Sequence, residues 1–500
     1  MSTSTVKSIL LRLAGPALGL LAFLVLRHLG NAPAAMAGVV LWMAVWWISE
    51  TVPLAVTALL PLVLFPMLGI ASTADTALNY GKDIIFLFLG GFLLALGIER
   101  SGLHKRAALW IIARVGAAPS RLLLGVMLGT ALLSMWINST AAVLVMLPIA
   151  LGLVDRARND ADRRKFGIAL LLGVSYGATI GGMSTPVGTP PNLVFMELSK
   201  QLFPGRAPVG FGQWMTFGVP LMLIYLAFAW TLLHLLFTRR LGSDAQGAAQ
   251  VQQELKDLGQ VSHDERFAAL FFILAAVLWI TGGRIEFSTE VVFEGWRREG
   301  WGLKGVSDAA VAIACSVPLF LVRSKRRRSA EHVDRTTEET AASSSPFSPL
   351  LSWHFAQDRI PWGVLLLIGG GLALASGFES SGLAEIIGNA LASWNTGNGF
   401  AQVGLIAVVV TVLSELGSNT AVAGLALPLL ASAAPAWGME AYDAMIPGTL
   451  AASCGFMLPI SSPMMAIVFG TGRVPVGAML RTGIWMDLAG VVLLALWFGW

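Results

Sequence analysis

Residues 122–154 form an uncharged, mostly apolar stretch, LLLGVMLGTALLSMWINSTAAVLVMLPIALGLV, with the polar residues Asn138-Ser139-Thr140 near its middle. As a single helix, these 33 residues would extend over about 50 Å, whereas the hydrocarbon core of a bilayer is about 30 Å thick. Two full spans would need more residues than the stretch provides. It therefore predicts a re-entrant hairpin, in which two half-helices meet at a polar tip near the middle of the membrane.

The composition of the whole chain supports a membrane environment. Of the 500 residues, 56% are hydrophobic and 12% are charged, against about 25% charged residues in an average soluble protein. These values exclude a soluble globular enzyme and a disordered chain, and the continuous apolar runs exclude a β-barrel with alternating strands. The two cysteines, Cys315 and Cys454, lie in apolar stretches and suggest neither a disulfide framework nor a zinc site. We expect an all-α polytopic membrane protein.

Two polar segments divide the chain. Residues 239–264 are charged and rich in glutamine, and residues 323–358 open with the basic run RSKRRR. Because basic loops stay on the cytoplasmic side, we expect both segments to be cytoplasmic linkers, and the basic run to be a topological anchor rather than a nucleic-acid site. The expected order is N-terminal scaffold helices (1–83), a first repeat (84–238), a linker (239–264), scaffold helices (265–322), a linker (323–358) and a second repeat (359–500).

The two repeats are recognised by polar and glycine identities rather than by shared apolar composition. At an offset of 280, Asn138-Ser139-Thr140 matches Ser418-Asn419-Thr420, and Ser101-Gly102-Leu103 matches Ser381-Gly382-Leu383. At an offset of 273, Gly182 matches Gly455. Further matches are Gly90-Gly91 with Gly370-Gly371, Gly97 with Gly377, Glu99 with Glu379, Ser134 with Ser414, Leu147-Pro148 with Leu427-Pro428, Pro186 with Pro459, and Thr189-Pro190 with Ser462-Pro463. The chain is therefore predicted to contain two homologous halves.

The distribution of basic residues predicts that the two halves are inverted. Arg121 precedes the first tip, and Arg156, Arg158, Arg163, Arg164 and Lys165 follow it. Around the second tip, residues 360–472 contain no Lys or Arg. The first hairpin (122–154) should thus open to the cytoplasm and the second (401–436) to the outside. An inverted pair with its site at the interface of the repeats is a common plan in transporters.

Each tip is expected to present the positive end of a helix. Asn, Ser and Thr are N-cap residues, and the helices that follow Thr140 and Thr420 would direct their positive dipole ends at the tips. The alternative for one tip is a helix kink softened by Ser and Thr and packed between neighbours. Two tips at matching positions in two halves favour a binding site.

Each half also contains an interrupted helix, expected at about 167–196 and 445–470. The first is broken by STPVGTPPN at 184–192 and the second by PISSPMM at 459–465, and proline breaks helical hydrogen bonding. Free carbonyls at membrane depth must line a cavity or meet protein, and they suit a small hard cation. None of the two hairpins and two broken helices contains Lys, Arg or His. An anion bound there needs dipoles, hydroxyls, amides and bound cations, which is a physical reason for ion coupling.

At these residues the sequence resembles the divalent anion/sodium symporter family, the INDY-type carriers of di- and tricarboxylates and, in some members, sulfate. The resemblance rests on the paired tips, on GTPPN at 188–192 and on SCGFMLPIS at 453–461, and it extends over essentially the whole chain from residue 36. It implies a homodimer whose protomers have about eleven transmembrane helices, two re-entrant hairpins and two broken helices. A scaffold domain would hold the dimer, and a transport domain would carry the site across the membrane by an elevator motion.

The resemblance also implies which residues bind the ions and the substrate. One sodium site would consist of Ser134, Asn138, Ser139 and the Gly188 carbonyl, and the other of Ser414, Gly417, Asn419 and the Ser461 carbonyl. The expected substrate-binding residues are Asn138, Ser139, Thr140, Thr189, Pro190, Ser418, Asn419, Thr420, Ser462 and Pro463.

Three positions depart from the family pattern. The first tip has Asn-Ser-Thr for the usual Ser-Asn-Thr, Ser462 stands for a Thr, and Met464-Met465 stands for Pro-Asn. A thioether is a weaker acceptor than an amide, so the second sodium site and the identity of the substrate stay open. The family also contains sodium-independent exchangers, so exchange of dicarboxylates, tricarboxylates or sulfate is the alternative.

Other classes of protein fit the sequence less well. An intramembrane enzyme would need a catalytic motif, and GVSYG at 173–177 matches the nucleophile-elbow pattern without the strand that this motif requires. Among the acids, Glu415 beside the second tip is the foremost candidate for a functional carboxyl, and a role in end-capping or packing is equally open. A non-transporting receptor has no need for inverted broken helices.

We therefore expect a sodium-coupled symporter of a small divalent anion, in particular a C4-dicarboxylate such as succinate, and not an enzyme. The expected partners are the anion, Na⁺, the lipid bilayer and a second copy of the chain, with no nucleic acid. The expected location is the cell membrane (the inner membrane in a bacterium), with the N-terminus in the cytoplasm and the C-terminus outside.

Overall fold

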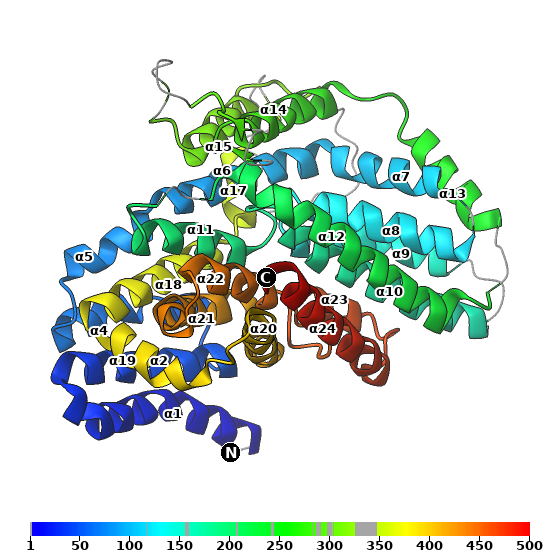
Figure 1. The fold of residues 1–500 in the computed structure, drawn as a ribbon. Coiled ribbons are helices and arrows are strands. Elements are labelled where there is room, and N and C mark those ends of the chain that lie inside the picture. The colour runs from blue at the N-terminus through cyan, green and yellow to red at the C-terminus, as the bar shows by residue number, and fades with distance from the viewer. Residues whose placement is uncertain are drawn as a thin grey trace.

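The computed structural model describes residues 3–116, 118–155, 160–206, 209–241, 245–283, 285–286, 292–297, 303, 305–325 and 348–500. Within these residues the chain is almost entirely helical (Figure 1). The exception is one short antiparallel pair of strands, β1 (Ile285–Glu286) and β2 (Val292–Phe293), and an isolated bridge between Arg323 and Pro349. The basic flank at Arg156 and Arg158 and most of the segment 323–358 lie outside the described residues.

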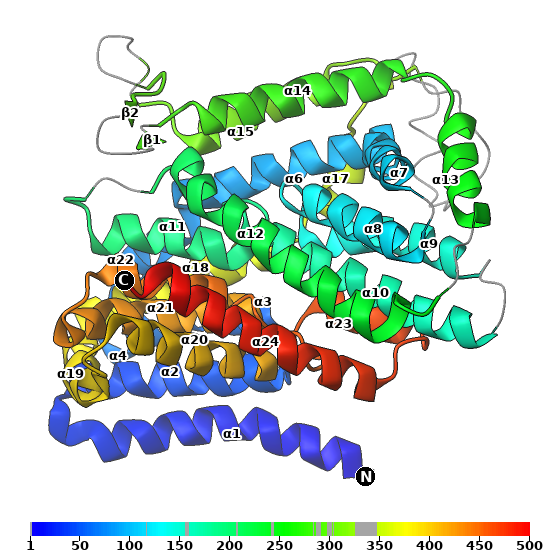
Figure 2. The same cartoon turned by 45° about the vertical axis from the view of Figure 1, so that its right-hand side comes forward.

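The N-terminal helices pack around the first helix of the second half. Helix α1 packs along α2, with the Gly19 and Gly38 backbones in close contact, and lies at the bottom of the molecule in Figure 2. Helices α2, α3 and α4 all contact α18. The bounds are α1 (Thr3–Leu26), α2 (Asn31–Ser49), α3 (Leu54–Thr57), α4 (Leu60–Leu68), α5 (Thr73–Leu78) and α18 (Trp362–Ser380).

The first half continues through the first hairpin and the first broken helix. Its elements are α6 (Asp83–Ser101), α7 (Leu103–Val115), α8 (Pro119–Ser134), α9 (Ser139–Val154), α10 (Asp160–Met183), α11 (Pro190–Leu202) and α12 (Phe211–Leu233). Helices α8 and α9 have 16 residues each, about 24 Å at 1.5 Å per residue, which is short of a full span. They pack against each other and against α10.

The middle of the chain and the second half follow the same plan. The polar segment expected as a linker contains a helix, α13, that packs against α7. The elements are α13 (Ala245–Asp257), α14 (His263–Ile280), α15 (Asp308–Ser316), α17 (Trp353–Arg359), α19 (Leu383–Leu391), α20 (Gly399–Leu416), α21 (Asn419–Ala433), α22 (Ala441–Ala451), α23 (Pro463–Gly470) and α24 (Val476–Phe498). Across the described residues, nine helices are long and apolar enough to cross a membrane, and four shorter apolar helices accompany them.

Matched sequences in the two halves make matched local structures. Ser101 Oγ donates to the Ile98 carbonyl (2.9 Å) and accepts from the Leu103 N–H (3.3 Å). At the matching turn, Ser381 Oγ donates to the Phe378 carbonyl (3.3 Å) and accepts from the Leu383 N–H (3.3 Å). In both turns the intervening glycine, Gly102 or Gly382, has a positive φ, which glycine adopts without strain. The same three residues therefore end the matching helices, α6 and α18.

The matched glycines mark where each half meets its neighbouring helices. A Cβ on Gly90 of α6 would lie 2.5–2.9 Å from Ala312 and Ile313 of α15. A Cβ on the matching Gly370 of α18 would lie 2.6–2.8 Å from Ala58, which follows α3. Each half thus places its first helix directly against the backbone of a helix that belongs to neither repeat.

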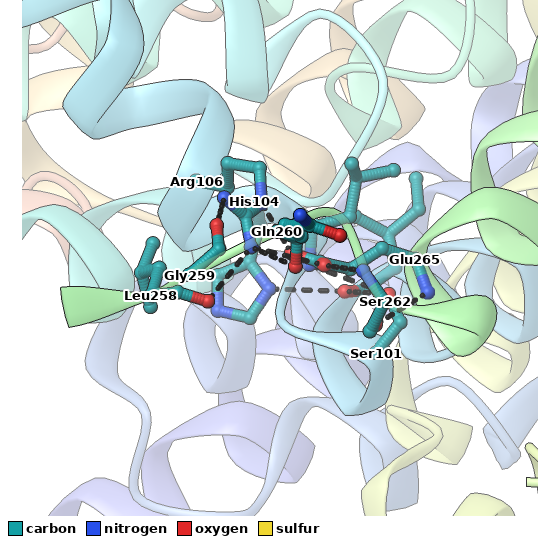
Figure 3. Close-up of polar contacts among 10 residues, drawn as sticks. Ser101, His104, Arg106, Leu258, Gly259, Gln260, Ser262 and Glu265 are labelled. Atoms are coloured by element: carbon teal, nitrogen blue, oxygen red, sulfur yellow. Dashed lines mark hydrogen bonds and ion pairs between the residues drawn. The ribbon is translucent and has the colours of Figure 1, made fainter. Parts of the chain in front are cut away.

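Arg106, near the start of α7, binds the segment between α13 and α14 (Figure 3). Arg106 of α7 forms two contacts with the carboxylate of Glu265, Nε to Oε1 at 2.7 Å and a terminal nitrogen to Oε2 at 3.2 Å. It also donates to the carbonyls of Leu258 (3.1 Å), Gly259 (2.9 Å) and Gln260 (3.2 Å), which follow α13. A single side chain therefore holds both the end of α13 and the start of α14.

Replacing Arg106 with alanine is expected to lower the free energy of unfolding by about 3 kcal/mol, because the buried Glu265 carboxylate would lose its partner. Thermal unfolding of the purified protein in detergent would measure the change. Arg473→Ala is the matched control, since the Arg473–Asp155 pair (2.7 Å) is exposed and contributes at most about 1 kcal/mol. Equal melting temperatures for Arg106→Ala and wild type would contradict this role.

Candidate functional site

The first polar tip is a short turn between α8 and α9. Helix α8 ends at Ser134 and α9 begins at Ser139, two residues before the expected start after Thr140. The Asn138 side chain caps α9 by accepting from the Thr140 N–H at 2.8 Å. Asn138 also lines a small pocket with Val187 and residues of α6 and the tip, namely Phe88, Gly91, Phe92, Ala95 and Trp136.

Three oxygens come together behind this tip. Ser134 Oγ and Ser139 Oγ are 2.8 Å apart, and Ser139 Oγ is 3.2 Å from the carbonyl oxygen of Gly188. Gly182 faces all three, since a Cβ there would lie 2.6 Å from Ser139 Oγ, 3.0 Å from the Gly188 oxygen and 3.3 Å from Ser134 Oγ. The first oxygen cluster, defined as Ser134, Ser139 and Gly188, therefore unites three of the four ligands expected for one sodium ion. The Asn138 amide oxygen is directed at the Thr140 N–H instead.

An asparagine organises the break between α10 and α11. The Asn192 side-chain amide donates to the carbonyls of Gly182 (3.2 Å) and Met183 (3.2 Å), at the end of α10, and to that of Thr185 (2.8 Å), just beyond it. Asn192 is fully buried, and Thr189, before it, is 7% exposed. The sequence places Asn192 in the GTPPN motif, but it does not predict the hydrogen bonds to three carbonyls. The signal in the sequence is an amide beside prolines that interrupt an apolar helix.

The second tip repeats the arrangement of the first. Helix α20 ends at Leu416 and α21 begins at Asn419. Ser414 Oγ is 2.9 Å from Asn419 Oδ1, just as Ser134 is near Ser139 at the matching positions, and it also donates to the Ala452 carbonyl (2.5 Å). Ser418 occupies the N-cap without a side-chain capping bond. Gly417 lies against Ile48 of α2, with a Cβ placed there 3.6 Å from it.

In the second broken helix a serine takes the place of the asparagine. Position 465, which matches Asn192, is methionine, and its sulfur accepts from Ser175 Oγ at 3.1 Å. The two carbonyls that match those of Gly182 and Thr185 belong to Gly455 and Leu458. Both accept from Ser461 Oγ, at 2.9 Å and 2.8 Å. Ser461 thus binds carbonyls that match two of those bound by Asn192 in the first half, and Ser461 and Ser414 both border Gly455.

Glu415 ties the second hairpin to the second broken helix. Its carboxylate accepts from the backbone N–H groups of Met457 (2.7 Å) and Leu458 (3.0 Å). Glu415 is 3% exposed, so this contact lies inside the protein. Of the roles considered for this carboxyl, capping of free backbone N–H groups is the one that the geometry shows.

Each half supplies a partner for the other half's hairpin. Helix α9 of the first hairpin packs against α23 of the second broken helix, and α21 of the second hairpin packs against α11 of the first. The Thr140 hydroxyl is 3.8 Å from the sulfur of Met464, which joins the first tip to the second broken helix. The two tips themselves share no hydrogen bond among the described residues.

The remaining candidate residues stand at the starts of the half-helices. Pro190 opens α11 and Pro463 opens α23, and the Ser462 side chain caps α23 by accepting from the Met465 N–H at 3.3 Å. The amides and hydroxyls of the tips are partly exposed, whereas the serines behind them are buried. The partly exposed set is Asn138, Thr140, Ser418 and Asn419, and the buried set is Ser134, Ser139, Ser414 and Ser461. Thr420 is 9% exposed.

Known proteins share this architecture. Two solved transporters have the same overall fold: YdaH of Alcanivorax borkumensis (TM-score 0.56, 16% identity, covering 85% of this chain and 86% of that one) and MtrF of Neisseria gonorrhoeae (TM-score 0.57, 13% identity, covering 85% and 83%). The predicted all-helical membrane fold is thereby confirmed. At these identities the likeness concerns the fold alone.

Sequence relatives extend over most of the chain. The sodium-dependent dicarboxylate transporter SdcS of Staphylococcus saprophyticus is 35% identical over 492 residues, covering 96% of this chain and 89% of the relative. SdcS of Staphylococcus aureus (strain USA300) is 36% identical over 466 residues, covering 92% and 84%. The family model described as "Sodium:sulfate symporter transmembrane region" matches residues 18–500. The chain therefore belongs to the sodium:sulfate symporter family, in agreement with the resemblance seen in its motifs.

Proposed function

We propose that the protein is a sodium-coupled secondary transporter of small divalent anions, with C4-dicarboxylates such as succinate as the preferred class. The proposal is supported by relatives named sodium-dependent dicarboxylate transporters over nearly the whole chain. The observation that carries it is a pair of oxygen clusters, one at each polar tip: the first oxygen cluster, and Ser414 Oγ with Asn419 Oδ1 (2.9 Å) at the second tip. Neither contains a basic side chain, because the stretches that build them have no Lys, Arg or His; these are residues 122–154, 167–196, 401–436 and 445–470.

Sodium binding would begin at the buried serines. At the first tip Na⁺ would contact Ser134, Ser139 and the Gly188 carbonyl, with Asn138 completing the set if its amide turns from the Thr140 N–H. At the second tip it would contact Ser414, Asn419, Gly417 and the Ser461 carbonyl. Hydroxyl, amide and carbonyl oxygens are the ligands that hard cations take. Each bound ion adds a positive charge just behind the tip.

The substrate would lie in front of the tips. Its carboxylates would meet Asn138, Ser139 and Thr140 on one side and Ser418, Asn419 and Thr420 on the other, with Thr189-Pro190 and Ser462-Pro463 alongside. The half-helices that begin at these residues direct free N–H groups and their positive dipole ends outward. Because the bound sodium ions would attract the dianion, sodium and substrate would bind cooperatively.

The proposal extends to the oligomeric state, the orientation in the membrane and the transport motion. The protein would act as a homodimer in the cell membrane, with its N-terminus in the cytoplasm and its C-terminus outside. The two halves would be inverted, and the hairpins and broken helices would move together as a transport domain against the α1–α5 and α14–α15 scaffold.

Uptake into proteoliposomes tests the transport mode. Labelled succinate should accumulate when an inward sodium gradient is imposed and should fail to accumulate when sodium is replaced by another monovalent cation. Sulfate and citrate added as competitors would rank the substrates, and the label should be recovered as unaltered succinate.

Two other outcomes would overturn the proposal. Uptake that requires dicarboxylate inside the vesicles and does not depend on sodium would identify an exchanger. Recovery of chemically altered label would identify an enzyme.

A further inference from the structure

The loop of the first broken helix is held by a buried amide. The Asn192 side chain is fully buried. It donates to the carbonyls of Gly182 (3.2 Å), Met183 (3.2 Å) and Thr185 (2.8 Å). Asn192 belongs to neither set of expected sodium ligands. The side chain that fixes this loop is therefore separate from the groups that would bind the ion.

The loop of the second broken helix is held by a hydroxyl instead. Ser461 Oγ lies 2.9 Å from the carbonyl oxygen of Gly455 and 2.8 Å from that of Leu458. An amide nitrogen carries two protons, whereas a hydroxyl has one proton to share between the two carbonyls. Ser461 matches Gly188 at the offset of 273, so its own carbonyl is the expected sodium ligand. One residue must therefore both hold this loop and bind the ion.

A methionine accounts for this difference between the halves. Met465 matches Asn192 at the same offset, and it is fully buried. Its sulfur accepts from Ser175 Oγ at 3.1 Å, but a thioether has no N–H group to donate. The space that matches the amide is thus filled by a side chain that cannot hold the loop, which leaves this task to Ser461.

The expected ligand oxygens converge in the first half. Ser139 Oγ is 2.8 Å from Ser134 Oγ and 3.2 Å from the Gly188 carbonyl oxygen. A Cβ on Gly182 would lie within 3.3 Å of all three oxygens. The three groups therefore already surround one point, with the loop fixed by Asn192.

The expected ligand oxygens do not converge in this way in the second half. Ser414 Oγ and Asn419 Oδ1 are 2.9 Å apart. A Cβ on Gly455, which matches Gly182, would meet Ser461 Cβ (3.1 Å) and the Ser414 carbonyl oxygen (3.3 Å), and neither is an expected ligand. The Ser461 carbonyl is therefore not drawn together with the other two ligands.

We infer that Asn192 and Ser461 are positioning residues that make the two sodium sites unequal. The first site has its ligand oxygens in place before the ion arrives, whereas the second is completed only when the ion binds. A preorganised site avoids the cost of ordering its groups, and groups that support metal ligands change affinity by about 10–100-fold. The first site should thus bind Na⁺ more tightly by about tenfold or more. This inference rests on the proposed function, which supplies Na⁺ as the ion.

Equilibrium binding of radiolabelled Na⁺ to the purified protein measures both sites without transport. The wild type should show a tight and a weak class of site. Ser139→Ala should remove the tight class and Asn419→Ala the weak class, which assigns each class to its tip. Met465→Asn gives the second loop an amide, whose oxygen can accept from Ser175. We expect this variant to tighten the weak class by about tenfold.

Two further variants separate positioning from general damage. Asn192→Ala removes the amide of the first loop, so it should weaken the tight class by about 10–100-fold and leave the weak class unchanged. Damage to the fold would weaken both classes. Met465→Leu is the matched control, because leucine fills the same buried space without an amide and should leave both classes as they are.

Hydrogen exchange followed by mass spectrometry tests the two loops directly. With choline in place of sodium, the backbone N–H groups of residues 455–461 should exchange faster than those of residues 182–188, because their loop is held by fewer donors. Added Na⁺ should slow the exchange at 455–461 more than at 182–188. In Met465→Asn the two loops should exchange alike without sodium.

The outcomes distinguish this inference from the proposed function. Two sodium sites of equal affinity in the wild type, equal exchange of the two loops without sodium, or a weak class that Met465→Asn leaves unchanged would each overturn the inference while the transporter stands. A wild-type protein that binds no Na⁺ at all would overturn the proposed sodium coupling, and with it the assignment of these loops to sodium sites.

Discussion

Alanine at position 419 is expected to reduce sodium-driven dicarboxylate uptake to background. Asn419 is the first residue of α21, and its side-chain oxygen is the partner of Ser414 Oγ at 2.9 Å. Alanine removes an expected sodium ligand and leaves the buried Ser414 hydroxyl with only the Ala452 carbonyl. Changes to groups that support metal ligands cost about 10–100-fold in affinity, and loss of a ligand itself should cost at least as much. Thr420→Ala is expected to have the same effect, because it removes the adjacent tip hydroxyl.

Uptake rates at increasing sodium concentrations, normalised to folded protein in the membrane, would measure this loss. The matched control is Asn398→Ala at the opposite end of α20. Asn398 caps that helix by accepting from the Ala401 N–H at 3.2 Å, and its loss should cost about 1 kcal/mol of stability without affecting uptake. If Asn419→Ala and Thr420→Ala both transport like the wild type, the tip is not the binding site.

Alanine at position 182 is expected to reduce uptake strongly, because it displaces the oxygens of the first oxygen cluster. The new Cβ would lie 2.6 Å from Ser139 Oγ and 3.0 Å from the Gly188 oxygen, both below ordinary van der Waals contact. Either Ser139 rotates away or the break between α10 and α11 shifts. In both cases the oxygens no longer converge, so we expect a fall in uptake of about 10–100-fold and a matching rise in the sodium concentration required.

Two other glycines separate this effect from general damage. Gly181→Ala would bring a Cβ to 2.3 Å from the Ala131 carbonyl where α10 crosses α8, so it should lower the yield of folded protein. Gly477→Ala meets nothing within 4 Å and should leave both folding and uptake unchanged. A Gly182→Ala protein with wild-type sodium dependence would show that the three oxygens do not bind the ion.

Much of the fold follows from local signals in the sequence. The polar residues 138–140 lie at the turn between α8 and α9. A helix that begins there has free backbone N–H groups, and Asn138 accepts a hydrogen bond from one of them. The proline pair Pro190-Pro191 marks the start of α11 for a different reason, because proline lacks an N–H group and is tolerated in the first turn of a helix. Helix α13 was missed, because its charged and glutamine-rich composition concealed the apolar face that contacts α7.

The candidate site was predictable as a set of elements and not as a set of contacts. The serines at 134 and 414 were identified from the repeat, and they do lie beside residues 139 and 419. The role of Ser461 in binding two carbonyls was not visible, since it compensates for a methionine at another position.

The contacts between the two halves also affect how the chain folds during its synthesis. The contact between Thr140 and Met464 joins residues 324 positions apart. At a synthesis rate of roughly 5–20 residues per second, the ribosome needs roughly 15–65 s to supply α23 after it has made α9. During that interval the first hairpin, with its polar turn, lacks its neighbour from the second half, α23. The nascent protein therefore depends on the insertion machinery, or on early contacts with α8 and α10, to shelter that turn from lipid until translation ends.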